Sequence, residues 1–554
     1  MYKWFSMRAV IPFIFILLLS YLAEAQTSSL NRPHDPVVLT GNLLQPLRPY
    51  TPEQIVGFRF NQGVWTQIPV QVDEKALLDI VLPYGDLSIL FGIPPSYSNP
   101  KTFLFCDSST YTGIDPLPLI DYDDELVFLA KDAGGESDGS FPQGVLDSIC
   151  TKVTIIDPLG GRGYVYLLIN DGSLTQNAGL NYITVSTDLP ATSGFPTNLH
   201  ITNYENTFVS TDRYSWHFSS EWVSDMLSLS VGNGFNLLDR HKCFLSDTSC
   251  SRTEDTFSEA ENAFVISKTG PVRYIRSYMG ANSGPLTQRT HIFYQGRQDI
   301  ITDLRVHSIG GFYDTFDWNS SAEGMIYKND LNPEGVVTDG IPDAIVDGDI
   351  QWEQLAGEQG TITTIHRRTT TISEDEAVFT SFYDDNLANP VSNCSGDGQS
   401  WAESGISVEF GDGICTDPLL FGCKGSPYFR MLQTRRTLYL DPPFGSVEMA
   451  SIYNQNTDHP LEVTVGECGL VVSLSEIKHE NEPQIYPNPG KGMLNIDTPN
   501  AVELSVFNNS GQKIKDLFVP ENGATIFLEN AGVYTLIFTM PGGNRVQKRV
   551  VVIR

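Results

Sequence analysis

The stretch Val502-Glu503-Leu504-Ser505-Val506-Phe507 alternates apolar and polar residues, which is the pattern of a β-strand with one buried face. Similar short runs lie on either side of it, at residues 493–496, 524–528, 534–540 and 546–552. Pro541-Gly542-Gly543-Asn544 joins the last two runs and has the composition of a tight hairpin turn. Residues 484–554 therefore predict a small, all-β sandwich.

This segment also carries several motifs in a fixed order. It opens with Tyr486-Pro487-Asn488-Pro489, continues through the turn 508–512 and the strand 531–536, and closes with the basic and apolar run 547–552. These motifs resemble the C-terminal sorting domain of the type IX secretion system of Bacteroidetes, although that family more often ends in a Lys-rich strand. The resemblance implies secretion to the outer cell surface or the medium, with the secretion machinery as partner. The alternative is an ordinary C-terminal sandwich, such as a carbohydrate-binding module, which does not need Tyr-Pro-Asn-Pro at its entrance.

The first residues of the chain predict a secretory signal peptide over 1–25. Lys3 and Arg8 give it a basic start, an apolar run follows, and Ala23-Glu24-Ala25 is a small-x-small cleavage site. The apolar run is shorter than the roughly 20 residues that a membrane span needs, and Pro12 interrupts it. We therefore expect export through the periplasm and no transmembrane segment after signal removal.

The composition favours turn-rich β structure and argues against two classes of partner. The 554 residues include 47 Gly and 33 Pro, and only 18% are charged, which is typical of β modules joined by turns. The formal net charge of -31 would repel nucleic acid and anionic membrane surfaces alike. We predict a mainly β, multidomain protein made of β-sandwich modules, with no nucleic-acid partner.

Changes in composition along the chain predict its domain organisation. The expected segments are a signal peptide at 1–25, an N-terminal β module at 26–133, a central β-rich body at 134–472, a linker at 473–483 and the sorting domain at 484–554. A Gly-, Ser- and Asp-rich link at 134–143 begins the body, and the linker is strongly polar. Short strands, including one at 361–371, fill the body. Helical periodicity is scarce, with residues 221–229 as the nearest candidate.

Eight cysteines in a chain with export signals predict disulfides rather than reactive thiols. Cys243 with Cys250, and Cys415 with Cys423, are close enough in sequence to close short loops. The connectivity of all eight stays open. Their spacing matches no zinc pattern, because the chain has no Cys-x-x-Cys and the histidines lie elsewhere.

The strands 287–294 and 299–307 form the element in which we expect a ligand site. Their even positions are mostly apolar, so an odd-length connection that buries those positions together is expected. That register gathers polar side chains on the opposite face: Arg289, His291, Asp303, Arg305 and His307. Guanidinium groups hold carboxylates, and His or Asp can move protons, so this face suits an anionic or hydroxyl-rich ligand. The alternative is a solvated outer face on which Arg and Asp pair across strands.

The segments 270–280 and 291–307 also resemble, loosely, strands of the galactose-mutarotase-like supersandwich found in many carbohydrate-active enzymes. The resemblance includes no diagnostic catalytic motif, so it implies no catalytic residue. The sequence has no Gly-rich phosphate loop, no Gly-x-Ser-x-Gly and no His-Glu-x-x-His. These absences weaken nucleotide-dependent, serine-hydrolase and zinc-protease functions.

Two acidic turns make calcium a candidate ion. The turns contribute four carboxylates, Asp339, Asp343, Asp347 and Asp349, in Asp-Gly contexts like those that hold calcium in extracellular β-proteins. The alternative is a plain turn, because Asp and Gly favour turns without any metal. A further polar run, residues 239–242 before Cys243, is expected to be a charged loop.

The sequence thus favours a secreted or cell-surface protein whose central body binds extracellular glycan. Two alternatives remain open. One is a carbohydrate-active enzyme, a lyase or hydrolase, that uses the 289–307 face. The other is a calcium-stabilised adhesin.

Overall fold

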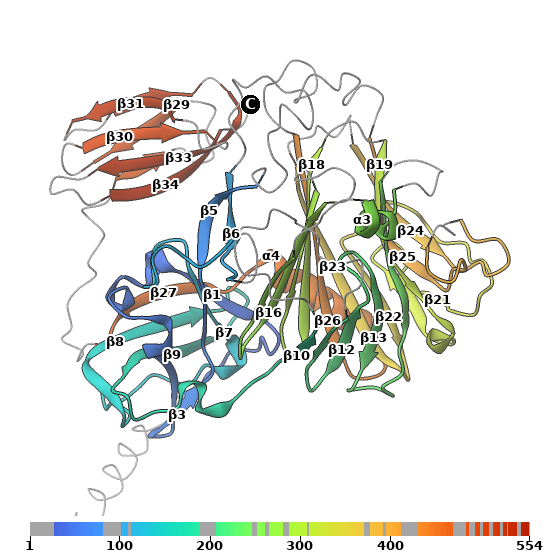
Figure 1. The fold of residues 1–554 in the computed structure, drawn as a ribbon, viewed down its shortest axis with the longest axis horizontal. Coiled ribbons are helices and arrows are strands. Elements are labelled where there is room, and N and C mark those ends of the chain that lie inside the picture. The colour runs from blue at the N-terminus through green and yellow to red at the C-terminus, as the bar shows by residue number, and fades with distance from the viewer. Residues whose placement is uncertain are drawn as a thin grey trace, which may run out of the picture. The chain divides into compact units, whose positions relative to one another are not determined.

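A computed structural model describes most of the chain (Figure 1). The described residues are 27–80, 101–108, 112–188, 206–245, 252–260, 265–280, 287–306, 310–370, 377–391, 395–410, 430–468, 483–486, 493–498, 502–508, 513–520, 524–528, 530–539 and 545–552. The predicted signal peptide and residues 473–482 of the predicted linker lie outside them. Among the described residues, no helix has the length and apolar character needed to cross a membrane.

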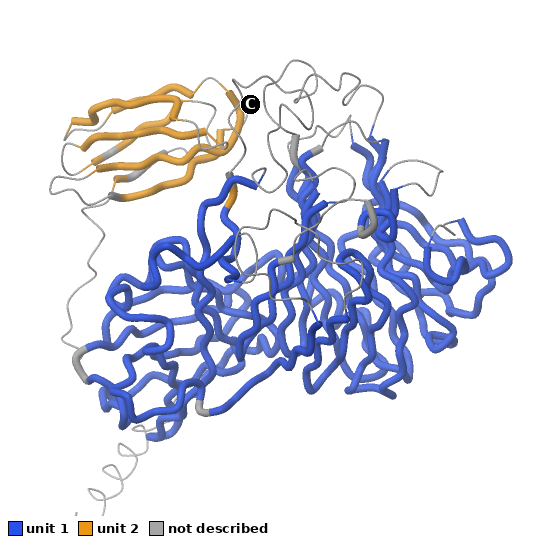
Figure 2. The backbone as a smooth tube through the Cα atoms, viewed as in Figure 1, with its two compact units in different colours: residues 1–97, 103–468 blue, residues 98–102, 469–554 orange. Residues whose placement is uncertain are grey.

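The chain divides into two compact units (Figure 2). Unit 1 consists of residues 1–97 and 103–468, and unit 2 consists of residues 98–102 and 469–554. Each unit is built mainly from β-strands arranged in separate sheets. This architecture confirms the predicted mainly β, multidomain fold class.

Two sheets build the first part of unit 1. One has the order β27 (Glu462–Glu467), β8 (Val145–Ile156), β9 (Arg162–Asn170), β2 (Ile55–Asn61) and β3 (Val64–Ile68). The other has the order β1 (Pro36–Thr40), β7 (Glu125–Leu129) and β4 (Gln71–Asp73). Apolar residues of both sheets, including Leu39, Leu126 and Leu167, meet in one core. Strands from both sides of the predicted boundary at 133/134 therefore share the five-stranded sheet.

The rest of unit 1 is a sandwich built on a nine-stranded antiparallel sheet. Its order is β15 (Val265–Thr269), β16 (Tyr274–Gly280), β17 (Thr287–Phe293), β18 (Arg297–Val306), β26 (Arg430–Asp441), β23 (Gly360–Thr370), β22 (Trp352–Gly357), β20 (Ile326–Asn329) and β21 (Val336–Val337). In Figure 1 these strands run through the middle of unit 1.

Two four-stranded sheets complete the sandwich. One has the order β14 (Leu238–Leu245), β19 (Gly311–Trp318), β25 (Glu403–Phe410) and β24 (Ala377–Asp384). The other has the order β10 (Thr184–Thr187), β11 (Thr207–Ser210), β12 (Tyr214–Phe218) and β13 (Ser224–Leu229). A large apolar core joins the three sheets and includes Trp216, Phe316 and Leu438.

Helices are few, as expected, but the predicted candidate is wrong. Residues 224–229 of that candidate form strand β13, because Leu227 and Leu229 alternate into the core while their neighbours are only partly buried. The described helices longer than one turn are α3 (Glu254–Ala260) and α4 (Val447–Asp458). Helix α4 lies on the outer face of the nine-stranded sheet, where Tyr453 stacks on Tyr439 with ring centroids 3.8 Å apart.

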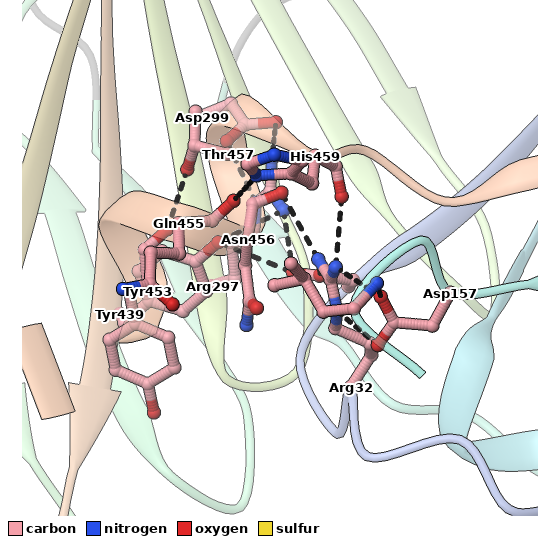
Figure 3. Close-up of polar contacts among 12 residues, drawn as sticks. Arg32, Asp157, Arg297, Asp299, Tyr439, Tyr453, Gln455, Asn456, Thr457 and His459 are labelled. Carbon is pink, nitrogen blue, oxygen red and sulfur yellow. Dashed lines mark hydrogen bonds and ion pairs between the residues drawn. The ribbon is translucent and has the colours of Figure 1, made fainter. Parts of the chain in front are cut away.

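The segment before β1 ties the two parts of unit 1 together through Arg32 (Figure 3). The Arg32 guanidinium donates to both carboxylate oxygens of Asp157, at 2.8 and 2.6 Å, and to Asp35 at 3.1 Å. It also donates to the carbonyl oxygens of Asn456 and His459, at 3.1 and 2.8 Å. Those carbonyls lie at the C-terminal end of α4, where a cation compensates acceptors that the helix itself leaves free.

The Arg32→Met substitution should therefore destabilise unit 1. It would leave the buried Asp157 carboxylate without its cation, a loss that typically costs about 3–5 kcal/mol. Urea unfolding followed by tryptophan fluorescence should show a lower midpoint for Arg32→Met. Arg162→Met is the matched control, since the Arg162 side chain is exposed and a change of less than about 0.5 kcal/mol is expected. Equal midpoints for the two variants would contradict the role given to Arg32.

Unit 2 confirms the small sandwich expected from the alternating runs. One sheet has the order β31 (Lys513–Val519), β30 (Val502–Phe507), β33 (Gly532–Thr539) and β34 (Arg545–Val552), and the other has the order β28 (Gln484–Tyr486), β29 (Met493–Asp497) and β32 (Ala524–Phe527). Their buried faces meet in a core that contains Leu504, Val506 and Leu536. Tyr486 ends β28, whereas Pro487, Asn488 and Pro489 lie outside the described residues.

Candidate functional site

The hairpin β17–β18, which carries the predicted ligand residues, has a register different from the expected one. The Tyr294 N–H donates to the Arg297 carbonyl at 2.8 Å, so only Gln295 and Gly296 form the turn. Arg289 consequently pairs with Thr302, and His291 with Ile300. The expected odd-length connection is wrong. A shift of one residue turns every side chain of one strand to the other face.

The predicted set is therefore split between two faces of the sheet. Arg289 and His291 point into the sandwich and are fully buried. Asp303 and Arg305 lie on the opposite face, where Asp303 accepts from Gln433 Nε2 at 2.8 Å and Arg305 donates to Gln288 Oε1 at 3.1 Å. His307 lies outside the described residues. The assignment of these residues to ligand binding stays a prediction.

Arg289 belongs to a network of buried charges centred on Asp314. Asp314 Oδ1 lies 2.6 Å from His241 Nε2 and 3.2 Å from Arg436 Nη1, and Asp314 Oδ2 lies 3.1 Å from Arg289 Nη2. All four side chains are at most 1% exposed. Burial alone would raise the pKa of Asp314, but Arg289, His241 and Arg436 hold it far below its ordinary value. Burial and the nearby Arg289 lower the pKa of His241 to about 3, so its ring is neutral.

The network continues from Arg436 to a carboxylate and a histidine. Arg436 Nη2 lies 3.4 Å from Glu353 Oε1, and His366 Nε2 lies 3.1 Å from the same oxygen. Burial alone would raise the pKa of Glu353, but the hydrogen bond from His366 and the charge of Arg436 outweigh it and lower the pKa. An ionised Glu353 can only accept hydrogen bonds, so Nε2 of His366 carries the proton between them. The other ring nitrogen, Nδ1, has no hydrogen-bond partner among the described residues.

His366 is part of the wall of a pocket with a volume of about 360 Å³. The pocket lies between strands of the nine-stranded sheet, β23 and β26, and strands β24 and β25 of the four-stranded sheet. Side chains from six stretches of the sequence line it, and those used below are Asp349, His366, Arg368, Phe379, Thr434 and Asp458. The Oγ1 atom of Thr434 is also buried and has no hydrogen-bond partner within the described part of the chain.

Ion pairs balance the charges around this pocket. Arg368 donates from both Nη atoms to the two oxygens of Asp349, at 2.5 and 2.6 Å, and its guanidinium lies 3.8 Å from the ring centre of Phe379. Arg367 donates to Asp458 Oδ1 from Nε and Nη2, at 3.1 and 2.7 Å. Each arginine of the pocket thus faces one carboxylate. The pocket is polar without being strongly charged.

This pocket was not predicted from the sequence, although the strand that carries His366 was expected. Three consecutive side chains that can carry positive charge, His366-Arg367-Arg368, lie near the end of an otherwise apolar and Thr-rich strand. That run is a signal for a polar site. Its partners were not recognisable, because Asp349, Phe379, Thr434 and Asp458 come from separate elements.

The four predicted calcium ligands do not form one tight carboxylate group. Asp349 pairs with Arg368, and the other three, Asp339, Asp343 and Asp347, are absent from the carboxylate groups whose oxygens lie within 4.8 Å of one another in the described residues. The group that meets this criterion is Asp239, Asp317 and Asp397. There Lys242 Nζ lies 2.6 Å from Asp317 Oδ2 and already supplies a positive charge. Calcium binding stays a prediction.

The run 239–242 is part of a strand, which corrects the expected charged loop. Strand β14 begins at Leu238 and directs His241 to Asp314 on one face, while Lys242 meets Asp317 and Glu403 on the other. Both side chains are about 1% exposed. The charged run was predicted to lie on the surface because its ion-pair partners, which lie on other strands, cannot be recognised from the sequence.

One disulfide joins two cysteines that are far apart in the sequence. Cys150 in β8 and Cys468, just after β27, form a disulfide with a Cα–Cα distance of 5.3 Å, although 318 residues separate them. Cys243 carries a free thiol buried in β14, so its predicted bridge to Cys250 is not observed in the part of the chain that is described. Cys250, Cys415 and Cys423 lie outside the described residues.

Removing the central carboxylate with Asp314→Asn should destabilise the sandwich. Arg289 and Arg436 would keep their buried charges without a counter-charge, which typically costs about 3–5 kcal/mol. Urea unfolding at neutral pH measures the loss. Glu334→Gln is the control, because Glu334 is exposed and a change below about 0.5 kcal/mol is expected. A difference of less than about 1 kcal/mol between the two variants would show that water or rearrangement compensates the arginines.

The Asp314 contribution should also depend on pH in a defined direction. Its pKa in the folded protein lies below the value in the unfolded chain, so the stabilisation is complete above the unfolded pKa of about 3.9 and is lost as pH falls towards the folded pKa. The stability difference between the wild-type protein and Asp314→Asn should therefore shrink between about pH 5 and pH 2. A constant difference over that window would contradict the depressed pKa.

Comparisons with known proteins identify one part of the chain. Residues 484–553 match the family described as the secretion system C-terminal sorting domain. Similar solved structures include an alpha-mannosidase from Enterococcus faecalis V583, with 8% identity, a TM-score of 0.33 and coverage of 91% of this chain and 56% of that one. Another is a mutant of the heparan sulfate lyase HepC from Pedobacter heparinus, with 9% identity, a TM-score of 0.23 and coverage of 64% and 43%.

The chain spans little more than half the length of the first of these structures and less than half of the second. No curated protein matches it in sequence. The family match covers the segment in which the alternating strands and the Tyr-Pro-Asn-Pro motif were recognised. Residues 484–553 are therefore a secretion system C-terminal sorting domain, and the chain is directed out of the cell.

Proposed function

We propose that this protein passes through the periplasm, is exported by the type IX secretion system to the outer cell surface or the medium, and binds extracellular glycan there through unit 1. The binding site is the pocket at His366. The sorting domain supports the route. The pocket supports the activity, because it combines polar side chains from several strands in one concave site.

One observation carries the assignment to glycan. His366 and Thr434 line the pocket, and their Nδ1 and Oγ1 atoms are buried with no hydrogen-bond partner among the described residues. A buried polar atom without a partner costs about 1–3 kcal/mol, so a ligand that supplies the partner recovers that free energy. A sugar hydroxyl both donates and accepts, so it can partner either atom when the side chain turns that atom towards the ligand.

The rim of the pocket offers further hydrogen bonds of the same kind. Each oxygen of Asp349 uses one lone pair on Arg368 and keeps another for a ligand hydroxyl. The Arg368 fork also retains N–H groups that Asp349 does not use. A planar ion pair of this type can bind neighbouring hydroxyls of one sugar ring. The stacking face of Phe379 is already covered by Arg368, so hydrogen bonds rather than ring stacking would dominate recognition.

A carbohydrate-active enzyme is the second candidate function, and one observation favours it. Glu353 holds Nε2 of His366, and His366 lines the pocket, which is the arrangement of a histidine oriented by a carboxylate for general-base chemistry. Product analysis on a panel of polysaccharides distinguishes the two functions. Turnover that disappears in His366→Gln would establish the enzyme, and binding without products would establish the binding protein.

Glycan binding should depend on the two unpartnered atoms. Thr434→Val removes the hydroxyl at nearly constant shape, and an affinity loss of about five- to tenfold is expected for the purified full chain on a glycan array. Thr369→Val is the matched control, because Thr369 lies on β23 with an exposed side chain and does not line the pocket. Array binding that is the same in both variants would place the glycan elsewhere, and no binding at all would refute the function.

Export should depend on unit 2 and not on the pocket. Deleting residues 484–554 should leave the protein in the periplasm, whereas His366→Gln in the full chain should be exported normally. Immunoblots of periplasmic, surface and medium fractions measure both outcomes. Mass spectrometry of the exported protein should find a C-terminus before residue 484. An intact tail in the medium would instead favour a carbohydrate-binding role for unit 2.

A further inference from the structure

We infer that unit 1 has a second contact site for a glycan chain, in which the exposed rings of Phe444 and Phe235 stack on sugar rings. The inference rests on the proposed function, because it adds a surface for a glycan polymer to the pocket at His366. A strained turn, two exposed rings and the meeting of three turns at one end of the sandwich support it.

Phe444 has a backbone conformation that is unfavourable for a bulky residue. Its φ is +64°, in the left-handed region that glycine and asparagine adopt readily. Burial does not offset this strain, because Phe444 is 70% exposed. Glycine or asparagine would form the same turn without the strain, so the turn itself does not require a phenylalanine. The ring therefore serves a contact outside the folded chain.

The turn that carries Phe444 is held against the turn between β22 and β23. The Phe444 N–H donates to the Gly357 carbonyl at 3.2 Å, and the Gly445 N–H donates to Thr361 Oγ1 at 2.8 Å. Thr361 Oγ1 in turn donates to the Pro442 carbonyl at 2.8 Å. The ring is thus presented from a fixed backbone, so little conformational freedom is lost when a ligand packs on it.

A second exposed ring is carried by another loop that packs against the β22–β23 turn. In this loop, which joins β13 to β14, a Cβ atom at Gly232 would lie only 1.9 Å from the Gln359 carbonyl oxygen. Phe235 of the same loop is 62% exposed. Its N–H donates to Asn233 Oδ1 at 3.0 Å, which fixes the loop beside the ring. Two exposed aromatic residues therefore lie on loops that pack against one turn.

Separate rings among polar groups suit a sugar better than they suit a protein. One face of a pyranose ring carries mainly C–H groups, which pack on the negative face of an aromatic ring, while its hydroxyls bond to polar groups nearby. A protein interface instead buries a more apolar centre. Here the exposed polar residues Asn233 and Glu358 accompany the two rings. The chemistry therefore favours a glycan chain as the ligand.

This surface is separate from the pocket. Gly360 borders the turn, and His366 lies six residues further along β23, which corresponds to about 20 Å at the usual rise per residue of a strand. The rings therefore form a contact of their own. A long glycan that also occupies the pocket gains affinity from both contacts.

The test measures the affinity of the purified full chain for polysaccharides. Affinity electrophoresis in gels that contain xylan, galactomannan, laminarin, pullulan or pectin gives a dissociation constant for each polymer. Phe444→Ala and Phe235→Ala should each weaken binding of the best polymer about two- to tenfold, the range that one aromatic contact supplies. The double variant should lose about the product of the two factors. Tyr122→Ser is the matched control, because Tyr122 is 49% exposed and lies outside these turns.

A second substitution separates the ring from the backbone that carries it. Phe444→Gly removes the ring and the strain together, whereas Phe444→Ala removes the ring alone. Both variants should lose polymer affinity to the same extent. The urea midpoint of Phe444→Gly should be higher than that of Phe444→Ala, because glycine adopts a positive φ without a steric penalty. A purely structural role for Phe444 would instead lower the midpoint and leave polymer affinity unchanged.

The outcomes separate the inference from the function on which it rests. Polymer affinity that stays unchanged in the Phe444 and Phe235 variants, or falls equally in Tyr122→Ser, would overturn the inference and leave glycan binding by the pocket intact. A change of oligomeric state in sedimentation, without a change of polymer affinity, would assign the rings to a second copy of the chain and overturn the glycan assignment. Failure of every polysaccharide and of the glycan array to bind would overturn the proposed function and the inference together.

Discussion

Asp314 is an ionised carboxylate in the dry interior of the sandwich, and the arrangement of unit 1 depends on how it is compensated. Its counter-charges, Arg289 and Arg436, belong to the nine-stranded sheet, whereas Asp314 and His241 belong to the four-stranded sheet. Apolar contacts between two sheets tolerate sliding, but a buried ion pair is stable only at one relative position. The network therefore fixes which strands oppose each other across the core.

The same network reaches the wall of the pocket, where it orients the buried side chain of His366. Arg436 is shared between Asp314 in the core and Glu353, and Glu353 in turn holds Nε2 of His366. The orientation of the His366 ring in the pocket wall is thus set by its contact with Glu353, which Arg436 also contacts. A polar network in which each member is paired transmits position as well as charge.

The limits of the sequence analysis follow from burial. Unit 2 was predictable because each strand has one buried and one exposed face, so Leu504 and Val506 alternate visibly with polar neighbours. Strands β17 and β18 are covered on both faces: Ile300 lies in the sandwich core and Ile292 packs with Val127 and Leu129. The alternation of apolar residues then carries no information about the register of the hairpin. The register is set instead by the two-residue turn between the strands. The pocket and the Cys150–Cys468 bridge join segments far apart in sequence, which no local pattern reveals.

The position of the disulfide bears on whether the structure of unit 1 depends on the sorting domain. Strand β27 is an edge strand whose side chains are mostly exposed or half-buried, so apolar packing holds it only weakly. Cys468 directly follows that strand and anchors it covalently to β8, immediately before the chain passes into unit 2. The pocket residues lie between Asp349 and Asp458, and the Asp314 network also lies within unit 1. Removing the sorting domain would therefore take away no residue of the pocket or its supporting network, and the last strand of unit 1 would still be held in place.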